Sequence, residues 1–334
     1  MYCLSYNLRQ GGSMSSSWSL ASSNLTSVAV LVFVLGFLGA LIKSDVRIPD
    51  SVYQLISIYL LFGIGLKGGH ALKSVTAHSF IKPAIATLAL GIAIPLLAFF
   101  VLKLIRKLND IDRGAIAAHY GSTSLVTFSA ALLYLENNKI HVEGFAAALL
   151  TLLEIPGVIV GVYLGSRKGA EKVQWYKTVK EVITGKTVLL LAGGLVIGAI
   201  TTAAGYQKVT PFFVDLQSGF LALFLMHLGY LAGSNWGEIK KVGLSVALFG
   251  ITFPMISGTL GVLVGHWVGL SLGGTVILGV LCASGSYIAA PAAVSVGLPK
   301  ANAPLALMSS IGVTFPFNLI VGIPLYLEIA KQLF

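Results

Sequence analysis

The stretch Ala283-Ser284-Gly285-Ser286-Tyr287-Ile288-Ala289-Ala290-Pro291 interrupts an otherwise apolar run from Leu272 to Val296. A run of that length is long enough to span a bilayer as a helix. Its central Ser-Gly-Ser, followed closely by Pro291, is where such a helix breaks most easily. Broken helices at membrane depth occur only where protein buries them or where they line a polar cavity, and they are a common way to build a transport site.

A second interruption has a similar composition. His119-Tyr120-Gly121-Ser122-Thr123-Ser124 interrupts the apolar run from Ala115 to Leu135, and Gly121-Ser122 precedes Gly285-Ser286 by 164 residues. Three more short matches occur in the same order at similar spacings, namely Gly91…Pro95 with Gly250…Pro254, Ile64-Gly65 with Leu228-Gly229, and Ile155-Pro156 with Phe315-Pro316. Four ordered matches predict an internal repeat.

The composition is that of an integral membrane protein. Of the 334 residues, 56% are hydrophobic and only 10% are charged, whereas soluble domains carry roughly 25% charged residues. The net charge of +10 does not indicate a nucleic-acid partner, because the basic residues fall in short loops between apolar runs. Cys3 and Cys282, in the N-terminal tail and in a predicted span, form no disulfide framework or metal-ligand pattern.

The apolar runs predict an all-α polytopic membrane protein with ten transmembrane helices. They lie at about 27–42, 51–66, 83–102, 115–135, 144–164, 187–204, 212–231, 242–268, 272–296 and 301–329. We expect a disordered N-terminal tail (1–24), a first five-helix repeat (25–165), a cytoplasmic basic loop (166–186) and a second five-helix repeat (187–334). Because five is odd, the second repeat enters the membrane from the opposite side, which makes the repeats inverted.

The basic residues predict the orientation. One side of the predicted topology carries seven Lys and Arg and the other carries fifteen, and the richer side is expected to be cytoplasmic. Both termini then lie outside.

Inverted repeats bring the broken helices 4 and 9 together near the midplane of the membrane. Each break exposes the N-terminus of a half-helix, which binds anions through backbone N–H groups. Serine and threonine hydroxyls add donors for an anion and oxygen ligands for Na⁺. The candidate substrate-binding residues are Gly121, Ser122, Thr123, Ser124, Ser284, Gly285, Ser286 and Tyr287. The alternative is that these small residues only allow close helix packing.

Ionisable residues inside the predicted spans are few. Glu154 is the one carboxylate well inside a first-half span, and such groups are usually functional. We expect Na⁺ to be coordinated by Ser122, Ser286 and Glu154, or Glu154 to fix the crossing helices. The alternative is a glutamate that lies near the aqueous cavity or is protonated. His119 is a candidate proton relay or a packing residue. Lys67 either snorkels at a helix end or attracts anions.

The segment from Arg167 to Lys186 is most simply a positive-inside loop, and it is also suited to contact anionic lipid or an acidic partner. The sequence contains no nucleotide-binding loop, metal-ligand cluster or catalytic-triad pattern. We therefore expect no catalytic residues and no cofactor, and transport driven by an ion gradient rather than by ATP.

Several motifs resemble the SbtA family of sodium-dependent bicarbonate transporters. They are Gly65-Leu66-Lys67-Gly68-Gly69, Gly121-Ser122-Thr123, Glu154-Ile155-Pro156, Gly297-Leu298-Pro299 with Ala301-Asn302, and Ser309-Ser310-Ile311-Gly312. The resemblance implies a homotrimer of ten-helix protomers, each with a core and a gate domain. It also implies Na⁺–bicarbonate symport at the crossing of the broken helices, and regulation by a PII-like protein on the cytoplasmic side.

Two positions depart from the family pattern. Tyr287 and Ala289 stand where cyanobacterial members have aspartate and serine, which moves the expected cation towards Glu154. The segment 166–186 is also short for a PII-binding loop. The leading hypothesis is sodium-coupled bicarbonate uptake across a bacterial inner membrane by an elevator-like motion of core against gate. The alternatives are a symporter of another small monovalent anion coupled to Na⁺ or H⁺ and, from other classes, an intramembrane enzyme or a receptor.

Overall fold

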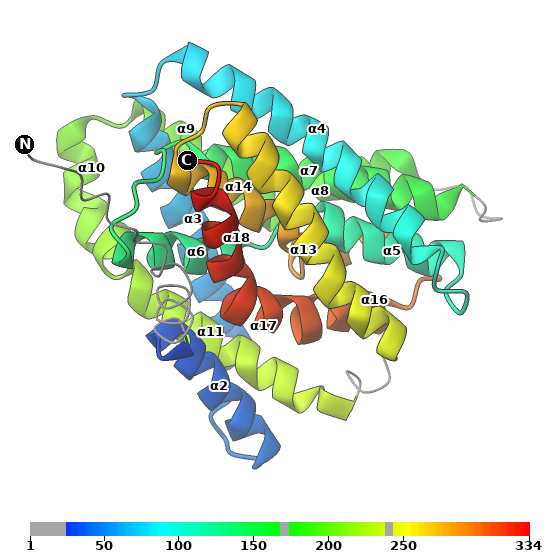
Figure 1. Cartoon of the computed structure of the whole chain (residues 1–334). Coiled ribbons are helices and arrows are strands. Elements are labelled where there is room, and N and C mark those ends of the chain that lie inside the picture. The colour runs from blue at the N-terminus through cyan, green and yellow to red at the C-terminus, as the bar shows by residue number, and fades with distance from the viewer. Residues whose placement is uncertain (1–24, 168–173, 238–242) are drawn as a thin grey trace, which may run out of the picture.

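The computed structural model describes residues 25–167, 174–237 and 243–334, and all regular secondary structure within these residues is helical (Figure 1). The tail 1–24 and Cys3 lie outside the described residues. The helices of the first half are α2 (Val28–Leu41), α3 (Asp50–Leu72), α4 (Ala77–Leu102), α5 (Asp110–Gly121), α6 (Leu125–Asn137), α7 (Ala146–Ser166) and α8 (Trp175–Thr184).

The second half begins with α9 (Lys186–Ile200), α10 (Ala203–Thr210), the π-helical turn η1 (Pro211–Asp215), α11 (Gln217–Ser234) and α13 (Leu244–Trp267). It continues with α14 (Leu272–Ala283) and α15 (Ala289–Gly297). It ends in a run of α16 (Ala303–Met308), η2 (Ser309–Thr314), α17 (Phe315–Phe317), η3 (Asn318–Gly322) and α18 (Ile323–Lys331).

Six helical segments are long and apolar enough to cross a membrane, by length and composition alone. They are Asp50–Leu72, Ser79–Leu102, Ala146–Ser166, Ala203–Ser234, Leu244–Trp267 and Ala303–Lys331. A seventh is obtained if α8 and α9, which are bent by 47° at Gly185, count as one span. The halves of the two broken helices are each too short to qualify alone, because a helix rises only about 1.5 Å per residue.

Two sets of helices pack closely among themselves. In the first set α2 lies along α11 and α3 lies along α9, and Figure 1 shows the α2–α11 pair at the lower edge of the view. Glycines bring the backbones together: a Cβ on Gly229 would lie 2.0 Å from Phe33 O, and one on Gly198 would lie 2.2 Å from Leu66 O. Such close approach is typical of helices packed in a membrane.

The second set surrounds the broken helices. α5 packs against α7 and α4, and α14 packs against α13 and α18. Side chains of both sets form one continuous buried core. The two sets meet mainly where α7 touches α3 and α9, and where α11 touches α6.

The structure corrects two expectations about single elements. The segment 166–186, expected to be a loop, contains the helix α8, whose Thr178 and Val182 are buried while Lys177 and Lys180 are exposed. The second predicted span does not end at 66 but continues to Leu72, because Gly68 and Gly69 fit closely against α7 and α9.

Candidate functional site

The two predicted interruptions are breaks between helices. α5 ends at Gly121 and α6 begins at Leu125, with extended backbone at Ser122 and Ser124. α14 ends at Ala283, and residues 284–288 lead to α15. The residues that end the first half-helices are Ser122 and Ser284, 162 residues apart. The sequence comparison indicated a spacing of 164 residues between the breaks, so the observed spacing is two residues shorter.

The two broken helices run in opposite directions. The start of α14 is tied to the segment that follows α6, since Ser271 N–H donates to Glu143 Oε1 over 2.5 Å. The start of α5 is tied to the segment that follows α15, since Asn302 N–H donates to Asp112 Oδ1 over 2.7 Å. The breaks themselves meet in the middle, where Ser286 N–H donates to His119 O over 2.8 Å.

Hydroxyl groups from the two breaks bind one another directly. Ser284 Oγ lies 3.0 Å from Thr123 Oγ1 and accepts a hydrogen bond of 3.0 Å from Ser124 N–H. Ser124 Oγ donates to the Tyr287 hydroxyl over 3.2 Å and accepts from Thr127 N–H, so it also caps α6. The backbone of one break is thus held by the side chains of the other.

Ser286 is positioned like Ser124. Its Oγ accepts from Ala289 N–H and Ala290 N–H, both at 3.3 Å, at the start of α15. We expected the N–H groups of Gly285–Tyr287 to face an anion, but in this conformation Ser286 N–H is bonded to the protein. The oxygen of Ser122, in contrast, is buried and has no hydrogen-bond partner among the described residues.

Both predicted glycines lie where a side chain would collide. A Cβ on Gly121 would lie 2.7 Å from Pro95 Cβ and 2.9 Å from Gly157 O. A Cβ on Gly285 would lie 2.5 Å from Ser310 Oγ. Close packing, the alternative that the sequence left open, is therefore a sufficient reason for glycine at both positions, and a role of the two glycines in binding substrate stays a prediction.

A small cavity lies beside the crossing. Its volume is about 10 Å³, which is enough for roughly one water molecule. The residues that line it are Thr123, Ser124, Leu125, Glu154, Thr187, Ser286, Tyr287 and Ile288. Four of the eight candidate substrate residues are among them, and of the three residues expected to bind Na⁺, Ser286 and Glu154 line the cavity whereas Ser122 does not.

Glu154 and Thr187 each bring an unpartnered oxygen to this cavity. Glu154 is 1% exposed, and neither its Oε2 nor Thr187 Oγ1 has a hydrogen-bond partner among the described residues. An isolated buried carboxylate is costly, so a proton or a cation is required at this position. Glu154 comes from α7 and Thr187 from α9, so the cavity lies between the two packing sets.

The sequence did not single out Thr187 or Asn318. Thr187 is in the first turn of α9, directly after Lys186, with no motif around it. Asn318 donates to Ala283 O over 2.8 Å and so holds the end of α14 at the break. An asparagine inside an apolar run was a visible signal for the second residue, because amides at membrane depth require partners.

Other polar residues of the breaks have structural partners. Tyr120 OH donates to Ser309 O and lies 2.6 Å from Thr314 Oγ1, which donates to Gly250 O. His119 Nδ1 donates to Ala115 O, and its Nε2 has no partner in the described part of the chain. A proton-relay role for His119 stays a prediction.

The oxygens around the small cavity suit an alkali cation better than a transition metal. No group of three His, Cys, Asp or Glu side chains is close enough to hold a metal ion within the described ranges. Carboxylate and hydroxyl oxygens are hard ligands, which cations without a demand for nitrogen or sulfur prefer.

The chain is similar to one known family over nearly its whole length. A family model described as the Na⁺-dependent bicarbonate transporter superfamily matches residues 28–331, from the start of α2 to the end of α18. A comparison with curated proteins gives no match.

Proposed function

Because the chain belongs to the Na⁺-dependent bicarbonate transporter superfamily, we propose that it carries bicarbonate across a bacterial inner membrane together with Na⁺. The observation that carries the proposal is the antiparallel crossing of two broken helices beside a buried carboxylate without a partner. The crossing offers hydroxyl and amide donors to an anion. The carboxylate requires a positive charge.

The pairing of helices supports ten spans in two inverted repeats. Taking the two broken helices as one span each, α3 is the second span and packs on α9, the sixth. α11 is the seventh span and packs on α2, the first. A two-fold axis in the membrane plane exchanges these two pairs, and it also exchanges the α5–α7 and α14–α18 contacts.

The hydroxyls of the breaks are proposed to hold bicarbonate. In this conformation Thr123, Ser124, Ser284 and Tyr287 bind one another, so the site is closed on itself. A small separation of the two breaks frees these donors, and Ser122 Oγ is already without a partner. Several neutral donors replace the water around bicarbonate without a fixed cation, which keeps its release possible.

Na⁺ is proposed to bind between Glu154 and Thr187. Tyr287 supplies no charge at the position where the family pattern has an aspartate, and Glu154 is the carboxylate among the described residues lining the cavity. The ion offsets the charge of Glu154 and adds a favourable field for the anion at the neighbouring breaks. Since Glu154 and Thr187 belong to different packing sets, the ion also links the two sets.

Transport then follows from relative motion of the two sets. The set of α2, α3, α9 and α11 is proposed to be the gate, and the set around α5 and α14 the core that carries both ions. The proposal keeps the homotrimer, the external termini and a PII-like cytoplasmic regulator as expectations from the family resemblance. Two alternatives remain at the same site: a proton instead of Na⁺ as the coupling ion, and another small monovalent anion instead of bicarbonate as the substrate.

The test is counter-flow of labelled bicarbonate in proteoliposomes that contain the purified protein. We expect uptake that requires Na⁺ and is not supported by choline. Uptake driven equally by a pH gradient without Na⁺ would assign the carboxylate to a proton. Stronger competition by formate or nitrite than by unlabelled bicarbonate would assign the site to another anion.

A further inference from the structure

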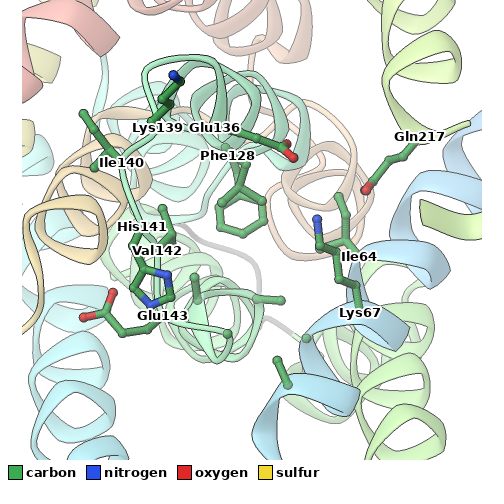
Figure 2. Close-up of a pocket in the computed structure, with 16 residues that line it drawn as sticks. Ile64, Lys67, Phe128, Glu136, Lys139, Ile140, His141, Val142, Glu143 and Gln217 are labelled. Atoms are coloured by element: carbon green, nitrogen blue, oxygen red, sulfur yellow. The ribbon is translucent and has the colours of Figure 1, made fainter. Parts of the chain in front are cut away.

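A second and larger cavity lies next to the crossing. Its volume is about 400 Å³, and it is bounded by α3, α6, the segment 138–145 and the starts of α7 and α11 (Figure 2). Most of its wall is apolar. Its charged, ionisable and amide side chains are Lys67, Glu136, Lys139, His141, Glu143 and Gln217, of which Glu143 is hydrogen-bonded to Ser271. No residue that lines the small cavity at the crossing lines this one.

Helix α6 connects the two cavities. Leu125 lines the small cavity at the crossing, and Phe128 and Leu132 line the large one. Residues three and four positions apart lie on one face of a helix, so the same face of α6 borders both spaces. Phe128 is 1% exposed, and its ring lies at the centre of the lining in Figure 2. Phe128 therefore lies in the wall of the large cavity, one helical turn along α6 from the residue that lines the small cavity at the crossing.

Charges of both signs face this cavity. Figure 2 shows the Lys67 amine, the Glu136 carboxylate and the Gln217 amide directed towards the same space. The side chains of these three residues make no hydrogen bond or ion pair within the described ranges. Charges in a recess with apolar walls act over a longer range than charges on an open surface, because less water screens them.

The three polar residues also come from different packing sets. Lys67 is on α3 and Gln217 on α11, in the proposed gate, whereas Glu136 is on α6, in the proposed core. A cavity between the two sets changes shape when they move relative to each other. This position is the one expected for an access path rather than for a packing defect inside one set.

We propose that the large cavity is the access vestibule of the transport path, in which Lys67 attracts bicarbonate, Glu136 attracts Na⁺, and Phe128 closes the floor above the crossing. The inference rests on the proposed function and extends it to a second site. A symporter of oppositely charged ions needs both signs of charge on the way in, since one sign alone repels one of its two substrates. A lysine that merely snorkels to the membrane surface does not distinguish between the two ions.

Transport kinetics give the first test. Lys67→Gln is expected to raise the half-saturating bicarbonate concentration by at least about threefold without raising that for Na⁺, as loss of one partly screened charge implies. Glu136→Gln is expected to do the reverse. Lys82→Gln is the matched control, because it removes an exposed positive charge from α4 outside the cavity and should change neither value.

Thiol labelling gives a second test that does not depend on transport. In a Cys3→Ser background, with Cys282 buried, Leu132→Cys places a thiol in the wall of the vestibule. An anionic thiol reagent should modify it faster, relative to a cationic reagent, when Lys67 is present than in Lys67→Gln, by about threefold. Bicarbonate should slow the modification of Leu132→Cys but not that of Thr76→Cys, an exposed site at the start of α4.

The outcomes separate the two proposals. If the parent protein shows no bicarbonate flux, the proposed function is wrong, whatever the labelling gives. If the parent transports bicarbonate but Lys67→Gln and Glu136→Gln match it for both ions, or if Leu132→Cys is inaccessible to both reagents, the vestibule is overturned and the proposed function stands. Faster flux in Phe128→Ala than in the parent would support Phe128 as the floor, and unchanged flux would contradict that role.

Discussion

The carboxylate of Glu143 holds Ser271 by two hydrogen bonds, one from the backbone N–H at 2.5 Å and one from the hydroxyl at 2.9 Å, across 128 residues of sequence. Ser271 in turn caps α14 through Gly274 N–H. The other broken helix has a corresponding bond: Asp112 Oδ1, at the start of α5, accepts from Asn302 N–H in the segment that follows α15. Each broken helix is thus fixed at its start by the segment that follows the other, which sets the position of the two breaks.

Removing the first of these ties should loosen the crossing. Glu143→Ala leaves the Ser271 donors without a charged acceptor, so we expect a loss of about 1–3 kcal/mol in stability and a lower unfolding temperature in detergent. Asp50→Asn is the control: it breaks the exposed Arg47–Asp50 pair, with side chains 58% and 72% exposed, and costs at most about 1 kcal/mol. Equal unfolding temperatures for the two variants would contradict a positioning role for Glu143.

The breaks were predictable because their chemistry is local. Gly121-Ser122 in the first run, and Ser284-Gly285-Ser286 with Pro291 in the second, weaken a helix whatever surrounds them, so the sequence located both interruptions within a few residues. The sequence comparison paired Ser122 with Ser286, two residues away from the pairing in the structure. There Ser124 corresponds to Ser286, because each side-chain oxygen accepts from the backbone N–H three residues later. Sequence spacing alone does not show these bonds. The helix α8 was not predicted, since the segment was interpreted as a basic loop.

The composition of the site was harder to predict. Glu154 was visible as a lone carboxylate in an apolar run, but Thr187, which lines the same cavity, comes from a helix in the other packing set. No local pattern marks a threonine that becomes important only through tertiary contact. The bonds of Ser309 and Asn318, in the turns η2 and η3, are equally non-local, because their partners are Tyr120 and Ala283.

The contact between Gly121 and Gly157 should tolerate no added atom. A Cβ on Gly157 would lie 1.8 Å from Gly121 O and 2.8 Å from Ser122 N, which are backbone atoms of the break. We expect Gly157→Ala to reduce folded protein severely, as judged by size-exclusion chromatography of the solubilised membrane fraction. Gly193→Ala, with nothing within 4 Å of the added Cβ, should be neutral. A normal yield of Gly157→Ala would show that α5 and α7 can separate at no cost.

The second break should depend on the pair Gly285 and Ser310. A Cβ on Gly285 would meet Ser310 Oγ at 2.5 Å, so Gly285→Ala should abolish most transport, and Gly285→Val all of it. Because the colliding atom is a hydroxyl, Ser310→Ala combined with Gly285→Ala should restore part of the flux. Additive losses in the double variant would place the defect elsewhere than in this contact.

Substitution of Ser122, whose oxygen has no partner, and of Ser286, whose oxygen is hydrogen-bonded, should affect stability differently. Ser122 Oγ is buried without a partner, so Ser122→Ala should leave stability unchanged while raising the half-saturating bicarbonate concentration about tenfold, the effect of losing one hydrogen bond to an anion. Ser286→Ala should also lose stability, by about 1 kcal/mol, because Ser286 Oγ caps α15. Thermal unfolding and uptake kinetics on the same preparations test this. Parent-like uptake by both variants would remove the serines from the site.

Glu154 and Thr187 should together determine the response to Na⁺. One buried carboxylate oxygen of Glu154 is unpartnered, and the proposed Na⁺ would supply the offsetting positive charge. Na⁺ should therefore raise the unfolding temperature of the parent, whereas choline should not. At about 100 times the dissociation constant the expected gain is about 2.7 kcal/mol.

Glu154→Gln keeps the shape and removes the charge, and it should abolish this gain while unfolding no earlier than the parent in the absence of Na⁺. Thr187→Val is isosteric and removes only the hydroxyl, so it should weaken the Na⁺ response by about tenfold. Glu136→Gln is the matched carboxylate control, since it lies in the vestibule and should leave the saturating gain intact. A full Na⁺-dependent gain in Glu154→Gln would move the cation away from the crossing and leave Glu154 as a protonated structural residue.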